Sequence, residues 1–102
     1  MPIVVFLARL KPGVDPAAYE RWVREVDYPR ARRLPSVISY VNHRLQAPLR
    51  KADVHYDYLE ILQVTDLDAY KQDLARPDIL DLRRQLMEFI EPSDNWIGEV
   101  IA

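Results

Sequence analysis

Asp27 is the ionisable residue whose position most favours chemistry. Four apolar side chains of a predicted helix share one narrow arc at about 100° per residue, namely Tyr19, Trp22, Val23 and Val26. Asp27 falls at the edge of this arc, so we expect its carboxylate to face the sheet, although the C-terminal end of a helix dipole disfavours negative charge. A general acid or base beside an aromatic pocket is one interpretation. The other is a structural carboxylate that pairs with Arg30 or Arg33.

Tyr28 and His43 are candidates for donating a hydrogen bond to negative charge that develops on a substrate. Pro29 favours an extended backbone at Tyr28, which would aim the phenol into a cleft. Alternatively, the ring packs at the helix end with its hydroxyl in water. His43 shares one face of a predicted strand with small and apolar residues, where an imidazole could transfer protons, but a hydrogen-bonded structural histidine fits the same pattern. We predict Asp27, Tyr28 and His43 as the catalytic residues.

Large aromatic residues are predicted to line a pocket for a flat, apolar ligand, and these are Trp22, Tyr40, Tyr58 and Trp96. Each of them alone would fit equally well in a hydrophobic core. Glu60 lies in the middle of a predicted strand, where a buried carboxylate needs a partner. We expect Arg44 on the neighbouring strand to be that partner.

These residues must be positioned by a chain that alternates strands and helices. Asp15 followed by Pro16 is typical of a helix start, and residues 65–68 have the form of a capping box before a helical region that breaks at Pro77. Strands are predicted at residues 3–9, 36–45, 55–64 and 96–102, with an exposed loop at 46–54. The order β-α-β-β-α-β predicts one α+β domain over residues 1–102 with a ferredoxin-like fold, in which a four-stranded antiparallel sheet has both helices on one face.

The first predicted strand is apolar on both faces, with Ile3, Val5 and Leu7 on one face and Val4, Phe6 and Ala8 on the other. Two helices cover only one face of the sheet, so the second face would be an exposed apolar surface of the kind that marks an interface. We predict a homodimer that packs sheet against sheet, as in dimeric α/β barrels. The alternative is a monomer whose second face is merely mixed.

The composition argues against several classes of function. Without cysteine the chain has no disulfide, thiol nucleophile or thiolate metal site, which is compatible with the reducing cytoplasm where we expect it. A net charge of −2 indicates no nucleic-acid surface, and the N-terminal apolar run is too short for a signal peptide or a membrane span. Two glycines are too few for a phosphate-binding loop, and the two histidines lack the spacing of helical zinc ligands. We predict no metal and no cofactor.

Several of these residues together resemble a known family. The segment Trp22-Val23-Arg24-Glu25-Val26-Asp27-Tyr28-Pro29, the following Leu34-Pro35-Ser36 and Tyr40, and the pattern Tyr58-x-Glu60-x-x-x-Val64-Thr65-Asp66-Leu67 resemble the REDY-like (HapK) family. More loosely, residues 29–40 resemble the EthD-like branch of dimeric α/β-barrel proteins. EthD-like relatives often place a histidine where this chain has Asp27 and Tyr28, so a histidine-dependent mechanism does not carry over to that position.

The resemblance implies a ferredoxin-like homodimer associated with the biosynthesis of prodiginine-type pyrrole or indole pigments, with cofactor-free cyclisation or condensation in some relatives. We therefore expect a cofactor-independent cyclase, dehydratase or isomerase that acts on a small aromatic or heteroaromatic intermediate. In this hypothesis Asp27 moves a proton, Tyr28 or His43 donates a hydrogen bond, and the aromatic rings hold the substrate. The alternatives are a non-catalytic dimeric accessory protein that binds the intermediate, a cofactor-free monooxygenase and, remotely, a haem protein that uses His43.

Overall fold

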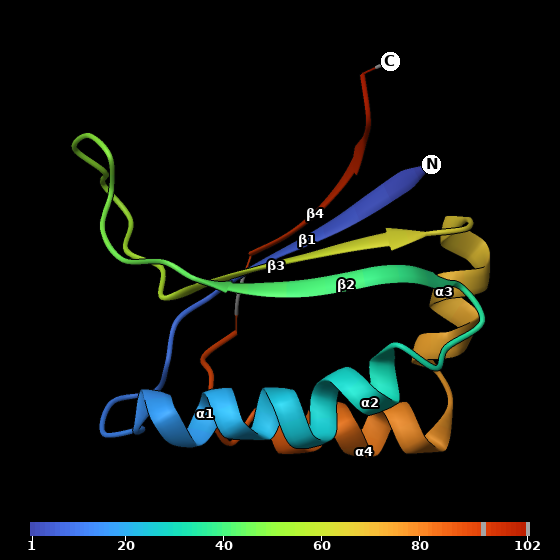
Figure 1. The fold of residues 1–102 in the computed structure, drawn as a ribbon, viewed down its shortest axis with the longest axis horizontal. Helices are drawn as coiled ribbons and strands as arrows, with labels where there is room; N and C mark the ends of the chain where they lie inside the picture. Colours follow the sequence, from blue (N-terminus) through green and yellow to red (C-terminus); the bar gives the residue numbers. More distant parts are fainter. Residues whose placement is uncertain (93, 102) are drawn as a thin grey trace.

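The computed structural model describes residues 1–92 and 94–101, which form a four-stranded antiparallel sheet with helices against one of its faces (Figure 1). The strands are β1 (Pro2–Ala8), β2 (Val37–Arg44), β3 (Tyr58–Val64) and β4 (Asp94–Glu99). The helical elements are α1 (Pro16–Trp22), the π-helical turn η1 (Val23–Asp27), α2 (Tyr28–Ala31), α3 (Leu67–Leu74) and α4 (Pro77–Leu86). Within the described residues, no helix is both long enough and apolar enough to cross a bilayer.

The strand order is β2-β3-β1-β4, with β1 paired to both β3 and β4 and with β2 at the edge. This is the ferredoxin-like arrangement, so the predicted fold class is confirmed. The strand ends differ slightly from the prediction. β3 begins at Tyr58 rather than at residue 55, and just before it the Asp57 carboxylate accepts the Leu10 amide at 2.8 Å. β4 begins at Asp94 and ends at Glu99, and residue 102 of the predicted strand lies outside the described residues.

Successive side chains of each strand point to opposite faces of the sheet. The face that meets the helices is buried and includes Val4, Ala8, Leu62 and Val64. In the described part of the chain, the other face carries no helix (Figure 1). We call it the open face. Its members include Val41, Ile61 and Trp96, which are 45%, 36% and 65% exposed.

The helices begin at or within one residue of the positions that the cap residues and prolines predicted. Asp15 accepts a backbone amide of the first turn of α1, and Pro16 is the first helical residue, as predicted. The predicted break at Pro77 is also confirmed, because α4 begins there. The predicted capping box starts one residue too early. The cap of α3 is Asp66 rather than Thr65, because the Asp66 carboxylate accepts the amide three residues later at 2.7 Å.

The predicted extended backbone at Tyr28 is wrong. Tyr28 is helical, with φ −56° and ψ −50°, and the chain continues into α2. The amide of Tyr28 donates to the carbonyl of Val23, five residues earlier, so the helix widens into a π turn before Pro29. A regular α-helix would press the Pro29 ring against the carbonyl of Glu25. The wider turn displaces that carbonyl and allows the helix to pass the proline.

Candidate active site

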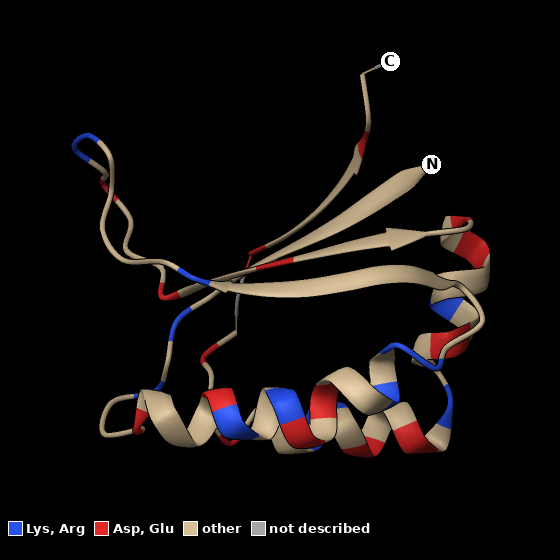
Figure 2. Cartoon of the chain, in the orientation of Figure 1, with Lys and Arg blue, Asp and Glu red and all other residues tan. Residues whose placement is uncertain are grey.

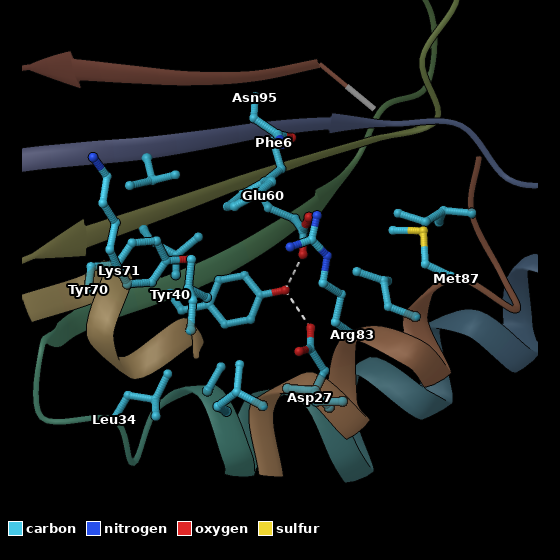
Figure 3. Close-up of a pocket in the computed structure, with 18 of the residues that line it drawn as sticks. Phe6, Asp27, Leu34, Tyr40, Glu60, Tyr70, Lys71, Arg83, Met87 and Asn95 are labelled. Carbon is cyan, nitrogen blue, oxygen red and sulfur yellow. Dashed lines mark hydrogen bonds between the residues drawn. The ribbon is translucent and has the colours of Figure 1, made fainter. Parts of the chain in front are cut away.

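Asp27 is the last residue of η1 and is only 7% exposed. Its carboxylate rises from the helical layer toward the sheet (Figure 3). The alternative of an ion pair with Arg30 is not observed, because Arg30 binds Asp81 instead, with 3.3 Å between Nη1 and Oδ2. The π turn thus inserts one acidic group into the core, and such turns occur frequently at functional sites.

Tyr40 and Glu60 meet Asp27 from the sheet. The register of β2 and β3 pairs Tyr40 with Leu62 and Asn42 with Glu60. Tyr40 and Glu60 are therefore diagonal neighbours on the helix-facing side of the sheet. The Tyr40 hydroxyl lies 2.5 Å from Asp27 Oδ2 and is also hydrogen-bonded to Glu60 Oε1 (Figure 3). We call Asp27 and Glu60 the acid pair.

The two hydrogen bonds at Tyr40 determine how many protons the acid pair holds. A phenol carries one hydrogen and can donate it to only one of the two carboxyl groups. The other contact is a hydrogen bond only if that carboxyl group is itself protonated and donates to the phenol oxygen. The arrangement therefore requires one proton on the acid pair in addition to the proton of Tyr40.

The electrostatic environment favours Glu60 as the protonated member. Burial raises the pKa of Asp27 to about 6, against the opposing effects of the Tyr40 hydrogen bond and the positive charge of Arg32. Burial raises the pKa of Glu60 to about 7, where the Tyr40 hydrogen bond opposes it and the charge of Asp27 adds to it. Burial and the neighbouring carboxylates also raise the pKa of Tyr40, so the phenol stays neutral. We assign Glu60 as the donor to Tyr40, and Tyr40 as the donor to the Asp27 carboxylate.

A cavity of about 650 Å³ opens beside the acid pair, between the sheet and helices α3 and α4. Asp27, Tyr40 and Glu60 contribute polar atoms to its wall (Figure 3). Most of the remaining lining is apolar and includes Val4, Phe6, Leu62, Leu74, Leu82 and Leu86. Its volume and its few convergent polar groups are typical of small-molecule sites. A carboxylate and a carboxylic acid joined by a phenol at such a wall can accept one proton and donate another.

The family is established by a comparison with known proteins. The model of the REDY-like protein HapK matches residues 2–101. The chain belongs to the HapK family. HapK from Hahella chejuensis is 30% identical and superimposes with a TM-score of 0.84, over 99% of this chain and 93% of that one. The resemblance seen in the sequence is therefore confirmed. No curated protein sequence matches the chain.

More distant solved structures share the fold alone. A protein from Bacteroides fragilis, described as dimeric and ferredoxin-like, is 13% identical with a TM-score of 0.71, over 97% of this chain and 95% of that one. SnoaB from Streptomyces nogalater, described as a cofactor-independent oxygenase, is 24% identical with a TM-score of 0.67, over 100% of this chain and 96% of that one. Proteins of the EthD and DABB families also share the fold, as the looser resemblance implied.

Of the three predicted catalytic residues, this HapK-family chain brings only Asp27 to the cavity. The Tyr28 ring packs edge-on against Tyr40, with centroids 5.1 Å apart, and its hydroxyl accepts the Asn42 amide at 2.8 Å. His43 is exposed on the open face, where its Nδ1 lies 3.0 Å from the carbonyl oxygen of Leu59. Asp27 and His43 therefore lie on opposite sides of the sheet and do not form one site.

Of the four aromatic residues predicted to hold a ring, Tyr40 is the one that lines the large cavity in the described structure. Trp22 is buried in the core, and its indole N–H donates to Gln85 at 3.0 Å. Tyr58 is buried too, with its hydroxyl 2.7 Å from a carboxylate of α1. Trp96 lies on the open face. A ligand in this cavity would be held mainly by aliphatic side chains rather than by an aromatic cage.

Glu60 is the site residue that sequence reasoning did not assign to the site. Its predicted partner, Arg44, binds Glu20 instead, with 2.7 Å between Nε and Oε2, because Arg44 lies at the end of β2 next to α1. The alternation of side chains along the strands could have indicated that Glu60 belongs to the site, since Tyr40 and Glu60 both lie on the helix-facing side of adjacent strands. Among the described residues, no group of three or more His, Asp or Glu side chains is arranged to hold a metal ion.

The acid pair predicts an unusual dependence of stability on pH. Both carboxyl pKa values are raised by folding, so the folded state binds more protons than the unfolded state between about pH 4 and 7. Stability therefore falls as the pH rises through this window, and we expect a loss of about 2–3 kcal/mol between about pH 5 and pH 8. Glu60→Gln should flatten this slope, as measured by urea unfolding at a series of pH values.

Glu20 is the matched control for this experiment. Its hydrogen bond with Arg44 lowers the pKa of Glu20 to about 2, so its contribution has the opposite sign and is lost only in acid. Glu20→Gln should leave the slope above about pH 5 unchanged. An unchanged slope in Glu60→Gln would contradict the assignment of the extra proton to the acid pair.

Proposed function

We propose that this HapK-family protein is a cofactor-independent acid–base catalyst that cyclises, dehydrates or isomerises a small aromatic or pyrrole- or indole-type intermediate in a biosynthetic pathway. The observation that carries the proposal is the Tyr40 hydroxyl held between two buried carboxyl groups at the wall of an apolar cavity. A core carboxyl pair that served folding alone would be replaced at little cost by apolar residues. Its position beside a cavity fits a chemical role.

In the proposed mechanism the two carboxyl groups have different tasks. Asp27, as the carboxylate, removes a proton from an acidic C–H or N–H of the bound intermediate. Glu60, as the acid, and Tyr40 stabilise the negative charge that develops on a neighbouring oxygen and supply the proton that the product needs. The raised pKa values keep both forms available near neutral pH. The apolar wall orients the reacting atoms and limits the access of water.

Proton removal can be tested without knowledge of the natural substrate. A panel of aromatic and indole-type ketones that carry exchangeable α-hydrogens is incubated with the protein in D₂O, and the loss of the α-proton signal is followed by NMR. Exchange faster than in buffer alone for at least one compound supports the proposal. If compounds bind but none exchanges faster, the protein is an accessory binder, which is the second hypothesis from the sequence.

The third hypothesis, a cofactor-free monooxygenase, is separated by an oxygen electrode. The distant likeness to SnoaB rests on the fold alone, because the identity is 24%. Consumption of oxygen that depends on an aromatic substrate, in place of simple proton exchange, would favour this hypothesis. Substrate turnover without oxygen uptake would favour the acid–base catalyst.

We further propose that the protein is a homodimer that buries its open face. This face exposes Val41, Ile61 and Trp96 on one side of the sheet, and contiguous exposed apolar surface often marks an interface. The Bacteroides fragilis protein with the same fold is described as dimeric. Because the large cavity lies on the other side of the sheet, each subunit would contain a complete site of its own.

Trp96→Glu is expected to convert the dimer into monomers, because it places a charge in an apolar interface. Sedimentation equilibrium should show the mass fall by half. Leu80→Glu is the matched control, since Leu80 is 54% exposed on α4, on the helical side of the molecule, and the dimer should persist in it. A monomeric wild-type protein at micromolar concentration would contradict the proposal.

A further inference from the structure

Lys71 and Arg83 stand out among the residues that line the large cavity. Both are exposed and positively charged, whereas the rest of the lining is mostly apolar apart from the acid pair and Tyr40. Lys71 comes from α3 and Arg83 from α4, so two separate elements bring positive charge to the cavity wall. Figure 2 marks basic positions on these helices, and Figure 3 shows Lys71 and Arg83 rising from the helical layer on opposite sides of Tyr40.

The pairing of the nearby arginines shows that Arg83 is a special case. Arg84 binds Asp81 at 2.5 Å, Arg30 binds Asp81 at 3.3 Å, and Arg76 binds Asp78 at 3.2 Å. Within the described residues, Arg83 forms no ion pair and no hydrogen bond, although it lies on the same helix as these acids. Its charge instead acts on the cavity wall, where it opposes the rise in the pKa of the buried Tyr70.

Lys71 is in the same situation. None of the ion pairs within the described residues includes it, although α3 carries acidic residues of its own. Lys71 and Arg83 are both exposed residues of the cavity wall, and neither is ion-paired in the described part of the chain. An anionic group can therefore approach them without displacing an existing ion pair. A charge-assisted hydrogen bond from a guanidinium to such a group is among the stronger polar contacts.

We infer that the cavity binds an aromatic or similarly apolar molecule that carries one anionic group, which Arg83 and Lys71 attract to the exposed part of the cavity wall. This inference rests on the proposed function and names the class of its substrate. The negative charge of the acid pair repels an anionic group, so it disfavours the reverse orientation of the ligand. The anionic group therefore faces solvent, and the apolar body places its reactive atoms beside Asp27 and Glu60.

A pair of fluorescent probes that differ only in charge tests this inference. Anilinonaphthalene sulfonate is an aromatic anion, and N-phenylnaphthylamine is its uncharged parent. We expect the wild-type protein to bind the anion about 10-fold more tightly than the neutral probe, and Arg83→Gln to lower this ratio by about 5-fold and Lys71→Gln by about 3-fold. Both residues are exposed, so the variants should fold, and thermal melting checks this directly.

Two further variants complete the experiment. Arg84→Gln removes a neighbouring positive charge that is already paired and should leave the ratio unchanged. Ile97→Trp narrows the cavity from β4, where Ile97 is 59% exposed, and should weaken both probes equally. Three results would overturn the inference. The ratio of anionic to neutral probe affinity could stay unchanged in Arg83→Gln and Lys71→Gln, or it could fall as much in Arg84→Gln. Alternatively, Ile97→Trp could bind both probes as tightly as the wild-type protein does.

A result that rejects the anionic ligand can be distinguished from a result that rejects the acid–base catalyst. The probe ratio measures binding alone and requires no turnover. Proton exchange that depends on Asp27, together with a charge-independent probe ratio, would leave the catalyst in place and reject an anionic substrate. A ratio that depends on Arg83 without any proton exchange would leave an anion-selective carrier.

Discussion

Replacing Asp27 with asparagine is expected to lower the rate of proton exchange by about 10²- to 10⁴-fold while making the protein more stable at about pH 8. The first effect follows because an amide cannot act as a base. The second follows because burial raises the pKa of Asp27 to about 6 in the folded state, so the ionised carboxylate destabilises the folded protein at about pH 8. Removing that charge should add about 1–3 kcal/mol to the free energy of unfolding.

The amide preserves the local geometry, since the side-chain oxygen introduced by Asp27→Asn can still accept the Tyr40 hydrogen bond. Exchange is followed by NMR in D₂O, and stability by urea unfolding at about pH 5 and pH 8. The stability gain should be smaller at about pH 5, where most of the folded protein already carries the Asp27 proton. Glu25→Gln is the matched control, because Glu25 is an exposed acid in the same π turn, and neither quantity should change in it.

The combination of the two effects separates catalysis from a structural role. A carboxylate retained for stability would lose stability on replacement, and activity would fall only as far as folding did. Loss of exchange in a more stable protein is the pattern of a group selected for chemistry at a cost in stability. Equal losses of stability and exchange in Asp27→Asn would reject the proposed role of this residue.

Tyr40→Phe is expected to destabilise the protein by about 2–4 kcal/mol, because it leaves two buried carboxyl groups without the donor and acceptor that they share. Both carboxyl groups would then depend on each other for a proton. The destabilisation should therefore increase as the pH rises from about 5 to 8. Exchange should fall by about 10-fold or more, since the bridge between the acid and the base is lost.

Tyr70→Phe is the control for this variant. Tyr70 is a buried tyrosine of the same cavity wall, and its hydroxyl has no hydrogen bond to any residue that the structure describes. It loses the same oxygen atom without breaking a network. Urea unfolding and the exchange assay should show small effects, and similar losses in both variants would indicate that the site tolerates no change of volume or polarity at all.

The fold could be predicted from the sequence because short segments of the chain determine where its helices and strands begin. Asp15, Pro16 and Pro77 mark helix starts by their own backbone chemistry, and the strands are marked by runs of β-branched and apolar residues. The homodimer was predicted from the apolar residues that β1 has on both faces, and it remains a proposal. The position of the Asp66 cap was missed by one residue, because two adjacent side chains can both accept the free amides of the first turn.

The site was only partly accessible, because it depends on pairing across elements. The inward direction of Asp27 follows from helical periodicity and is what the structure has. The partner of Glu60 depends on which of several nearby polar groups reaches it first, and Tyr40 rather than Arg44 does so. His43 was grouped with Asp27 as a catalytic residue because the sequence does not indicate which face of the sheet the helices cover. The structure places His43 on the face opposite to the helices.

A helix that gains one residue rotates everything beyond the insertion by about 100° relative to what precedes it, and the turn at Val23–Asp27 has this form. The direction of the Asp27 side chain therefore depends on this turn as well as on the packing of α1. Deleting a single codon in this turn would keep the hydrophobic stripe of α1 and swing the acid away from Tyr40. A one-residue deletion in this turn could therefore separate catalytic from non-catalytic proteins of this fold, without any change in the sheet or the other helices.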